Sequence, residues 1–253
     1  MHNVQIIILA AGHGTRMQHE LPKPLVPLLG KPMIQYLLDA IAESGVCDRV
    51  GIVVNPKNKE IFEATLGGAY TYILQHEQKG TGHAVAVARD HIGNATEPIL
   101  VLYGDMPFVS RETIQALAQK AHTSGAVITM GTTRVPDFNE WRSTFAGFSR
   151  VLRNDKGDVI ATVEAKDATP QQLALHEVNP AYLCFQSEWL WNHIDMITNT
   201  NAQSEYYLTD LIKMAVDEGN TLATVSVDPY DALGINTKEH LALCEEIIQS
   251  RIR

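Results

Sequence analysis

Cysteine is scarce in this chain, and the spacing of its three cysteines excludes the common structural roles of this residue. Cys47, Cys184 and Cys244 are odd in number and form no C-x-x-C pair, so neither a disulfide framework nor a cysteine zinc site is indicated. The ten histidines form no H-x-x-x-H or H-E-x-x-H pair, which argues against a histidine zinc site. We expect three separate thiols in a reducing compartment.

Positive charge and long apolar runs are lacking as well. The chain has 20 Lys and Arg residues against 29 Asp and Glu, a net charge of −9, whereas a nucleic-acid surface needs clustered cations. No apolar run approaches the ~20 residues that cross a bilayer, and no basic leader precedes the first apolar segment. We therefore expect no nucleic-acid partner, no membrane span and a cytoplasmic location. The sequence gives no sign of the oligomeric state.

Alternating apolar and amphipathic segments fill the first half of the chain. The 253 residues, 45% of them apolar, are enough for one domain with a substantial core. A helix after each strand implies βαβ crossovers, so we predict an α/β fold with a Rossmann-like, mostly parallel sheet flanked by helices. Strands are expected over 4–9, 49–54, 71–74 and 98–103, and helices over 32–44, 57–66, 81–91 and 110–124.

The pattern changes after residue 133. Residues 136–145 are polar and irregular, and the Asn-Asp-Lys-Gly-Asp turn at 154–158 separates two strand-like runs. This arrangement predicts a hairpin, and with it an antiparallel lobe beside the parallel sheet. Further helices are expected over 187–197, 206–218 and 238–251, and a further strand over 221–227.

A glycine loop with two nearby cations follows the first strand, whose apolar run suits burial on both faces. Gly12 and Gly14 allow backbone N–H groups to approach a phosphate without a Cβ in the way. Arg16 and Lys23 supply the positive charge that a polyphosphate needs. The loop should open at the carboxyl end of the strand, where open α/β sheets bind their ligands.

Two commoner phosphate loops are excluded by spacing. The segment contains no G-x-x-x-x-G-K-[ST] run, and Met17 stands where a dinucleotide fingerprint has its third glycine. The remaining alternative is a tight strand-to-helix turn with two solvated cations, which would seldom combine both charges with both glycines.

Several segments together resemble one enzyme family. Residues 9–32 resemble the signature of sugar-phosphate nucleotidyltransferases, and residues 75–84 resemble the nucleotide-base segment of the N-acetylglucosamine-1-phosphate uridylyltransferases. The matching segments that follow, in the family's order, are Tyr103-Gly104-Asp105, 164–169, 205–210 and 234–236. The resemblance implies a glycosyltransferase-A-like fold in a single domain, 1–253. Its parts would be a nucleotide-binding half (1–134), an antiparallel sugar-binding lobe (135–236) and a closing helix (237–253).

The resemblance implies transfer of UMP from UTP to N-acetylglucosamine 1-phosphate, with release of pyrophosphate. The expected catalytic residues are Arg16, Lys23 and Asp105. The nucleotide would be bound by Ala10, Ala11, Gly12, Gly14, Thr15, Gln75, Gly80 and Thr81. The sugar would be bound by Tyr103, Gly147, Glu164, Asn179, Tyr207 and Thr209.

A Mg²⁺ cofactor is expected on Asp105, because its carboxylate follows a buried strand and Mg²⁺ combines one or two protein oxygens with phosphate oxygens. The resemblance adds Asn236 as the second ligand. Each residue also has a structural explanation: Asp105 as a cap of the following turn, and Asn236 as part of a loop that enters the last helix.

The sugar side departs from the family pattern. Gly147 begins a Gly-Phe-Ser-Arg segment where the family has Gly-Tyr-Gly-Arg, and Asn179 is followed by Pro180-Ala181 in place of Thr-Gly. Proline removes a backbone N–H and alanine adds a side chain, so the acceptor sugar is open to change. The alternatives are therefore another NTP (CTP, GTP or dTTP) with another hexose or amino-sugar 1-phosphate, or a non-catalytic nucleotide-sugar sensor.

Bifunctional bacterial members of the family continue into a left-handed β-helix that acetylates glucosamine 1-phosphate. The 253 residues contain no hexapeptide repeat. The chain is thus expected to correspond to the first domain of such an enzyme or to a stand-alone enzyme.

Overall fold

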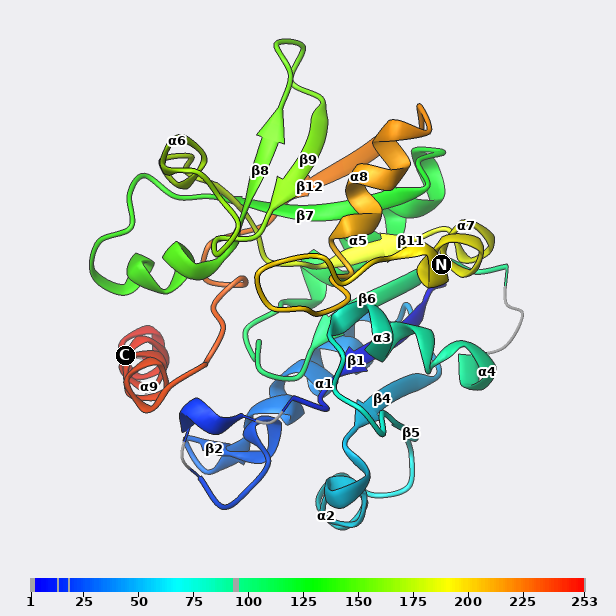
Figure 1. Ribbon diagram of the computed structural model, residues 1–253. Helices are drawn as coiled ribbons and strands as arrows, with labels where there is room; N and C mark the ends of the chain where they lie inside the picture. The colour runs from blue at the N-terminus through cyan, green and yellow to red at the C-terminus, as the bar shows by residue number, and fades with distance from the viewer. Residues whose placement is uncertain (1–2, 13, 18, 93–95, 253) are drawn as a thin grey trace.

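The isoleucine-rich segment near the start of the chain forms a middle strand of a ten-stranded sheet (Figure 1). The computed structural model describes residues 3–12, 14–17, 19–92 and 96–252. Strand β1 (Gln5–Leu9) lies between β4 (Val50–Val54) and β6 (Ile99–Tyr103), and β5 (Thr71–Leu74) pairs with β4. All these pairs are parallel, which confirms the predicted parallel sheet.

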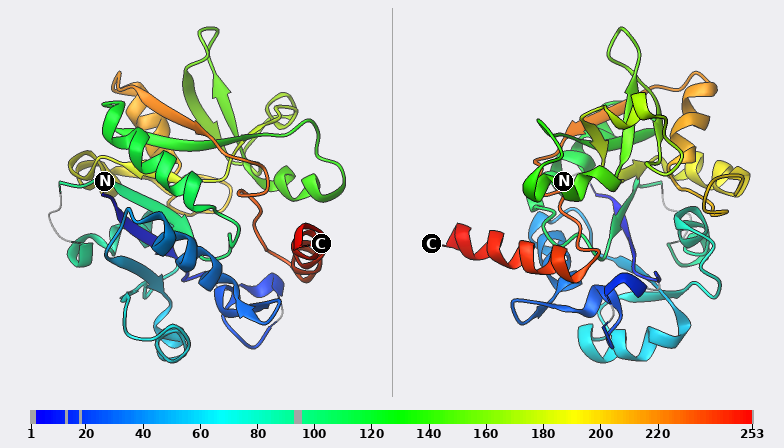
Figure 2. Two further views of the ribbon diagram at one scale, coloured as in Figure 1. Left: turned by 180° about the vertical axis from the view of Figure 1, so that it is seen from behind. Right: turned by 60° about the vertical axis from the view of Figure 1, so that its left-hand side comes forward.

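Helices cover both faces of this sheet, because successive side chains of a strand point to opposite sides. Ile6 and Ile8 of β1 belong to one core layer and Ile7 to the other, and all three are fully buried. The helices packed on the first layer are α1 (Met33–Ser44), α2 (Lys59–Leu66) and α5 (Arg111–Thr123). Those on the second layer are α3 (Thr81–Ala86), α7 (Ser187–His193) and α8 (Asp210–Asp217) (Figures 1 and 2).

The second half of the chain extends the same sheet and then reverses its direction. Next to β6 come β11 (Leu183–Phe185), which is antiparallel to it, and β7 (Ile128–Arg134), which is antiparallel to β11 and parallel to β12 (Leu222–Ser226). The far end of β7 pairs with β10 (Glu177–Asn179), and β8 (Ser149–Arg153) and β9 (Val159–Val163) follow as an antiparallel hairpin. The predicted hairpin and antiparallel lobe are thereby confirmed, and α6 (Pro170–Leu173) lies between β9 and β10 in the chain.

Several predicted helix bounds are wrong, and backbone hydrogen bonds explain the differences. The helix expected over 81–91 ends at Ala86 and resumes as α4 (Arg89–Ile92), since the N–H of Ala88 bonds the Val85 carbonyl three residues back and tightens the turn. The helix expected from residue 206 begins only at Asp210. The N–H and carbonyl of Tyr206 are engaged by Lys79 and Gly82 across the site, so Tyr206 cannot belong to the helix.

Smaller corrections concern three other helices. Pro32 caps α1 instead of starting it, and it pairs within β3 (Lys31–Pro32) with β2 (Pro27–Leu28). The helices expected over 57–66 and 187–197 each include a 3₁₀ turn, Pro56–Asn58 before α2 and Ile194–Met196 after α7. The irregular 136–145 segment leads into a longer 3₁₀ stretch, Glu140–Gly147.

The last helix returns to the beginning of the chain. Helix α9 (Lys238–Ile252) packs through Cys244 in a small apolar cluster with Met17, Leu28 and Met33. Figure 2 shows α9 beside the N-terminal loops, with its C-terminal end directed away from the sheet. None of the helices in the described ranges combines the length and the apolar character that crossing a bilayer requires.

Candidate functional site

Two adjoining cavities of about 710 Å³ and 320 Å³ lie at the carboxyl ends of β1, β5 and β6. The larger one is lined by the glycine loop and by the segment after β5, and the smaller one by the antiparallel lobe. The residues shared by both linings are Thr81, Tyr103, Asp105, Gly147, Gln203, Glu205 and Asn236. The predicted nucleotide and sugar residues other than Thr15 therefore line two compartments that meet at Asp105.

The glycine loop leaves β1 and turns sharply at Gly14, whose φ is +60°. A Cβ at this position would lie 2.8 Å from the Cβ of Lys23, whereas one at Gly12 would meet nothing within 4 Å. Glycine is thus required at position 14 by its conformation and by its contact with Lys23, while position 12 opens onto the cavity. Thr15 begins the 3₁₀ turn Thr15–Met17, and its side chain is outside the described part of the chain.

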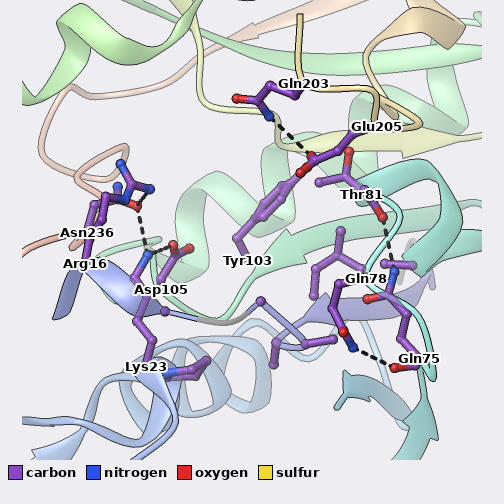
Figure 3. A pocket seen from close by; sticks show the side chains of 18 of the residues that line it. Arg16, Lys23, Gln75, Gln78, Thr81, Tyr103, Asp105, Gln203, Glu205 and Asn236 are labelled. Carbon is purple, nitrogen blue, oxygen red and sulfur yellow. Dashed lines mark hydrogen bonds and ion pairs between the residues drawn. The ribbon is translucent and has the colours of Figure 1, made fainter. Parts of the chain in front are cut away.

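Four predicted residues from distant parts of the chain meet in one hydrogen-bonded cluster (Figure 3). Lys23, in the 3₁₀ turn Lys23–Leu25, forms an ion pair with Asp105 and donates from Nζ to Oδ1 of Asn236 at 2.9 Å. Arg16 Nη2 donates to the same Asn236 oxygen at 3.0 Å. We call Arg16, Lys23, Asp105 and Asn236 the phosphate-end cluster.

The donor set of this cluster fits a hard divalent cation. Lys23 contacts both Asp105 and Asn236, so a carboxylate oxygen and an amide oxygen already face one positively charged group. Mg²⁺ takes such oxygens together with waters and substrate phosphates, and it does not need an all-protein cage. The described residues contain no group of three or more His, Cys, Asp and Glu that could hold a metal ion.

Gln75 lies at the end of β5 and lines the larger cavity, although its side chain is only 3% exposed. Its Nε2 donates to the carbonyl of Gly80 at 3.2 Å. Gln78, also in the cavity wall, donates from Nε2 to the Gln75 carbonyl at 2.9 Å. Ala10 and Ala11, both buried, complete this end of the wall.

The segment Gly80–Gly82 fastens the two halves of the site together. The Tyr206 N–H donates to the Lys79 carbonyl, and the Gly82 N–H donates to the Tyr206 carbonyl, each at 2.8 Å. Gly80 has φ +111°, and a Cβ there would lie 2.6 Å from the Tyr206 carbonyl oxygen. The Thr81 hydroxyl accepts from the Leu208 N–H at 2.9 Å. Gly80 and Thr81 line the cavity as expected, but their immediate contacts are with the sugar-side backbone.

Glu164 is the central acid of the smaller cavity. Its Oε1 accepts hydrogen bonds from Ser149 Oγ at 3.1 Å and from Thr209 Oγ1 at 2.8 Å. Burial raises the pKa of Glu164. Tyr207 and Thr209 are buried residues in the wall of the same cavity, in the segment that leads into α8. Tyr103 lies between the two cavities, and burial raises its pKa as well.

Gly147 is held in place by a buried arginine. Arg150, only 2% exposed, donates to the carbonyls of Phe148 and Ala146, which flank Gly147, and to the Leu173 carbonyl at 3.3 Å. The last residue of the Gly-Phe-Ser-Arg segment therefore fixes the backbone of the first, which lines both cavities.

The Asn179-Pro180-Ala181 segment combines a side-chain amide nitrogen that lacks a hydrogen-bond partner among the described residues with a strained backbone. Asn179 Oδ1 accepts from the Ala181 N–H at 2.8 Å, but its buried Nδ2 has no hydrogen-bond partner among the described residues. Ala181 has φ +63°, in the left-handed region that favours glycine. All three residues line the smaller cavity.

Three further residues line these cavities without an expected role: Lys166, Gln203 and Glu205. Lys166 donates from Nζ to Oε1 of Gln203, and Gln203 Nε2 lies 3.3 Å from Oε2 of Glu205. Lys166 and Glu205 lie inside segments that the family resemblance covers, so the sequence could have indicated that they line the site. Gln203 lies outside these segments, and no sequence pattern indicates a role for it.

Comparison with known proteins identifies the family of the chain. A family model described as a MobA-like NTP transferase domain matches residues 6–194. The chain is 39% identical over 254 residues to the "Bifunctional protein GlmU" of Heliobacterium modesticaldum, and 36% identical over 253 residues to that of Brevibacillus brevis. Both alignments cover 100% of the chain but only 54% and 53% of the relatives, so the chain spans about half the length of these proteins. By the match to more than half of its residues, the chain belongs to the family of MobA-like NTP transferase domains.

Proposed function

We propose that the chain transfers UMP from UTP to N-acetylglucosamine 1-phosphate, giving UDP-N-acetylglucosamine and pyrophosphate. The observation that supports this most is the phosphate-end cluster, where two cations and two oxygen ligands meet at the junction of two cavities. The larger cavity would take the nucleotide and the smaller one the sugar. We place the reaction in the cytoplasm, where nucleoside triphosphates are available.

In the proposed reaction, a phosphate oxygen of the sugar 1-phosphate attacks the α-phosphorus of UTP, and the bond from that phosphorus to the bridging oxygen of pyrophosphate breaks. The nucleophile is already an anion, so no side chain has to remove a proton. The chain must instead hold the two phosphates in line and balance their negative charge. Arg16 would neutralise the β- and γ-phosphates, and Lys23 would bridge the nucleotide and the sugar phosphate.

Asp105 and Asn236 would hold Mg²⁺, which when bound supplies positive charge to the α-phosphate oxygens. Lys23 contacts both of these side chains. Its ammonium group carries three hydrogens, so the third could reach a phosphate while the other two stay on these side chains. The charge that holds this cluster together would then also bind the substrate.

At the other ends of the cavities, side-chain amides would select the two substrates. Gln75 would read the edge of the base, and the free Nδ2 of Asn179 would donate to an oxygen of the sugar. Glu164, with Oε1 fixed by two hydroxyl groups, would present its second oxygen to a sugar hydroxyl.

A second candidate keeps the chemistry and changes the acceptor to another sugar 1-phosphate. It is favoured by Pro180 and Ala181, which stand in the wall of the smaller cavity where the family has Thr-Gly. The double variant Pro180→Thr/Ala181→Gly should shift the relative kcat/KM among sugar 1-phosphates if these residues set the preference. An unchanged ranking would remove this argument.

The deciding experiment measures pyrophosphate release with Mg²⁺ over a grid of ATP, CTP, GTP, UTP and dTTP against several sugar 1-phosphates. Turnover restricted to UTP with N-acetylglucosamine 1-phosphate is the expected result. Turnover with another pair would keep the mechanism and reassign the substrates. If the protein still binds nucleotide but releases no pyrophosphate with any pair, the chain is a non-catalytic nucleotide-sugar sensor and not an enzyme.

A further inference from the structure

The amide of Gln75 is held by two hydrogen-bond acceptors on one side. Its Nε2 lies 3.2 Å from the Gly80 carbonyl oxygen and 3.0 Å from Nδ1 of His83, which is on α3 behind the cavity wall. His83 does not itself line the cavity. Figure 3 shows the bond from the Gln75 amide nitrogen and the position of this side chain in the wall.

These contacts determine the orientation of the amide chemically. A carbonyl oxygen only accepts hydrogen bonds, so the Gln75 atom beside Gly80 must be the NH₂ group. The second hydrogen of that group is then available to His83, whose Nδ1 must accept it and whose proton therefore sits on Nε2. Both amide hydrogens are used, and within the described part of the chain Oε1 has no protein donor. Gln75 thus offers an acceptor, and no donor, to the cavity.

An acceptor at this point discriminates between pyrimidines. Uracil and thymine carry an N–H at ring position 3, whereas cytosine has a lone pair there, and two facing acceptors repel. We propose that His83 is a positioning residue for base selection, an inference that rests on the proposed function. It keeps the Gln75 amide in the orientation that accepts the N3–H of uracil or thymine and rejects cytosine. Among the described residues, removing the imidazole leaves the Gly80 carbonyl as the one hydrogen-bond partner of the amide.

The test compares His83→Leu, which removes the acceptor, with His83→Asn, whose side-chain oxygen can accept in place of Nδ1. Binding of UTP, dTTP and CTP with Mg²⁺ is measured by calorimetry without an acceptor sugar, so turnover is not required. We expect His83→Leu to reduce the UTP-to-CTP affinity ratio roughly tenfold, the effect of one hydrogen bond. His83→Asn should restore most of the ratio. The UTP-to-dTTP ratio should stay constant in both variants, because both bases have N3–H.

A matched control is His76→Leu, which removes an exposed histidine next to Gln75 and should leave every ratio unchanged. Equal weakening of all three nucleotides by His83→Leu would indicate a purely structural role and overturn the inference. Tighter binding of CTP than of UTP by the wild type would overturn it too. Nucleotide binding without turnover would contradict only the proposed function, whereas no nucleotide binding at all would contradict both.

Discussion

The two ends of the site differ in the sign of their charge: cations gather at the phosphate end and carboxylates at the sugar end. At the phosphate end, Lys23 pairs with Asp105 and Asn236 accepts from both cations, so two positive charges stand against one negative charge. At the sugar end, Asp210 is near the like charges of Glu164 and Asp167, which help to raise its pKa. In the proposed function, the phosphate end would bind groups that all NTPs share and could be fixed by charge. The sugar end would have to distinguish hydroxyl patterns, and it retains an unpartnered amide on Asn179 among the described residues.

The largest effect is expected from removing the central cation of the phosphate end. Lys23→Ala should lower kcat/KM for pyrophosphate release by about 10³-fold or more, because charge on the transferring phosphoryl group is no longer balanced. The matched control is Lys31→Ala, which breaks an exposed Lys31–Asp39 surface pair and should change kcat/KM by less than about twofold. A loss of less than about tenfold for Lys23→Ala would remove this residue from the proposed chemistry.

The next effect concerns the junction of the two ends. Gly80→Ala should destabilise the fold by about 2–4 kcal/mol and lower turnover by about 10²-fold, because its Cβ would force the Tyr206 backbone away. Gly67→Ala is the control: φ there is +83°, but a Cβ would meet nothing within 4 Å. With ψ −173° its backbone is strained for alanine as that of Gly80 is, so it should cost about 1–3 kcal/mol in urea unfolding but leave turnover normal. Equal effects of the two variants would contradict the tight junction.

A smaller effect follows from the crowded acids of the sugar end. Burial, with the charges of Glu164 and Asp167, raises the pKa of Asp210 from 3.8 to about 6. The folded state therefore holds this proton more tightly than the unfolded state does, and the associated stability, present below about pH 4, is lost as the pH rises to about 6. After allowance for solvent screening, we expect a loss of about 1 kcal/mol.

The measurement is urea unfolding of wild type and Asp210→Asn at pH 4 and pH 7. The wild type should lose about 1 kcal/mol more between the two values than the variant does. Asp217→Asn, at the exposed end of the same helix and paired with Lys213, should behave like the wild type. Parallel pH curves for all three proteins would show that the acids of the sugar end do not destabilise it.

The smallest effect tests the backbone strain of the sugar end. Ala181→Gly should raise the free energy of unfolding by about 0.5–1 kcal/mol, because the left-handed conformation costs alanine more than glycine loses in chain entropy. Ala174→Gly, at φ −74°, relieves no strain and should lower it by a similar amount. If both variants are destabilised in thermal melts, the strain at Ala181 is not a cost to the fold.

The sequence predicted the phosphate end better than the sugar end for physical reasons. The glycine loop and Lys23 are close in the chain, and Asp105 ends a strong apolar strand, so local patterns were sufficient. Strand β11 has three residues, which is too short for a period to be recognised. The role of Tyr206 depends on backbone bonds to Lys79 and Gly82, which no side-chain pattern encodes.

Arg16 and Asn236 are 220 positions apart in the sequence, so they are synthesised at different times. At about 5–20 residues per second of ribosomal synthesis, Arg16 precedes its partner by roughly 10–45 s. During that interval β4, β5 and β6 can add to β1, whereas β7 has to wait for β11, and the oxygen of Asn236 is still missing. A nascent chain would thus be exposed to nucleotides before its site is complete. The proposed reaction could begin only after the loop preceding α9 has docked.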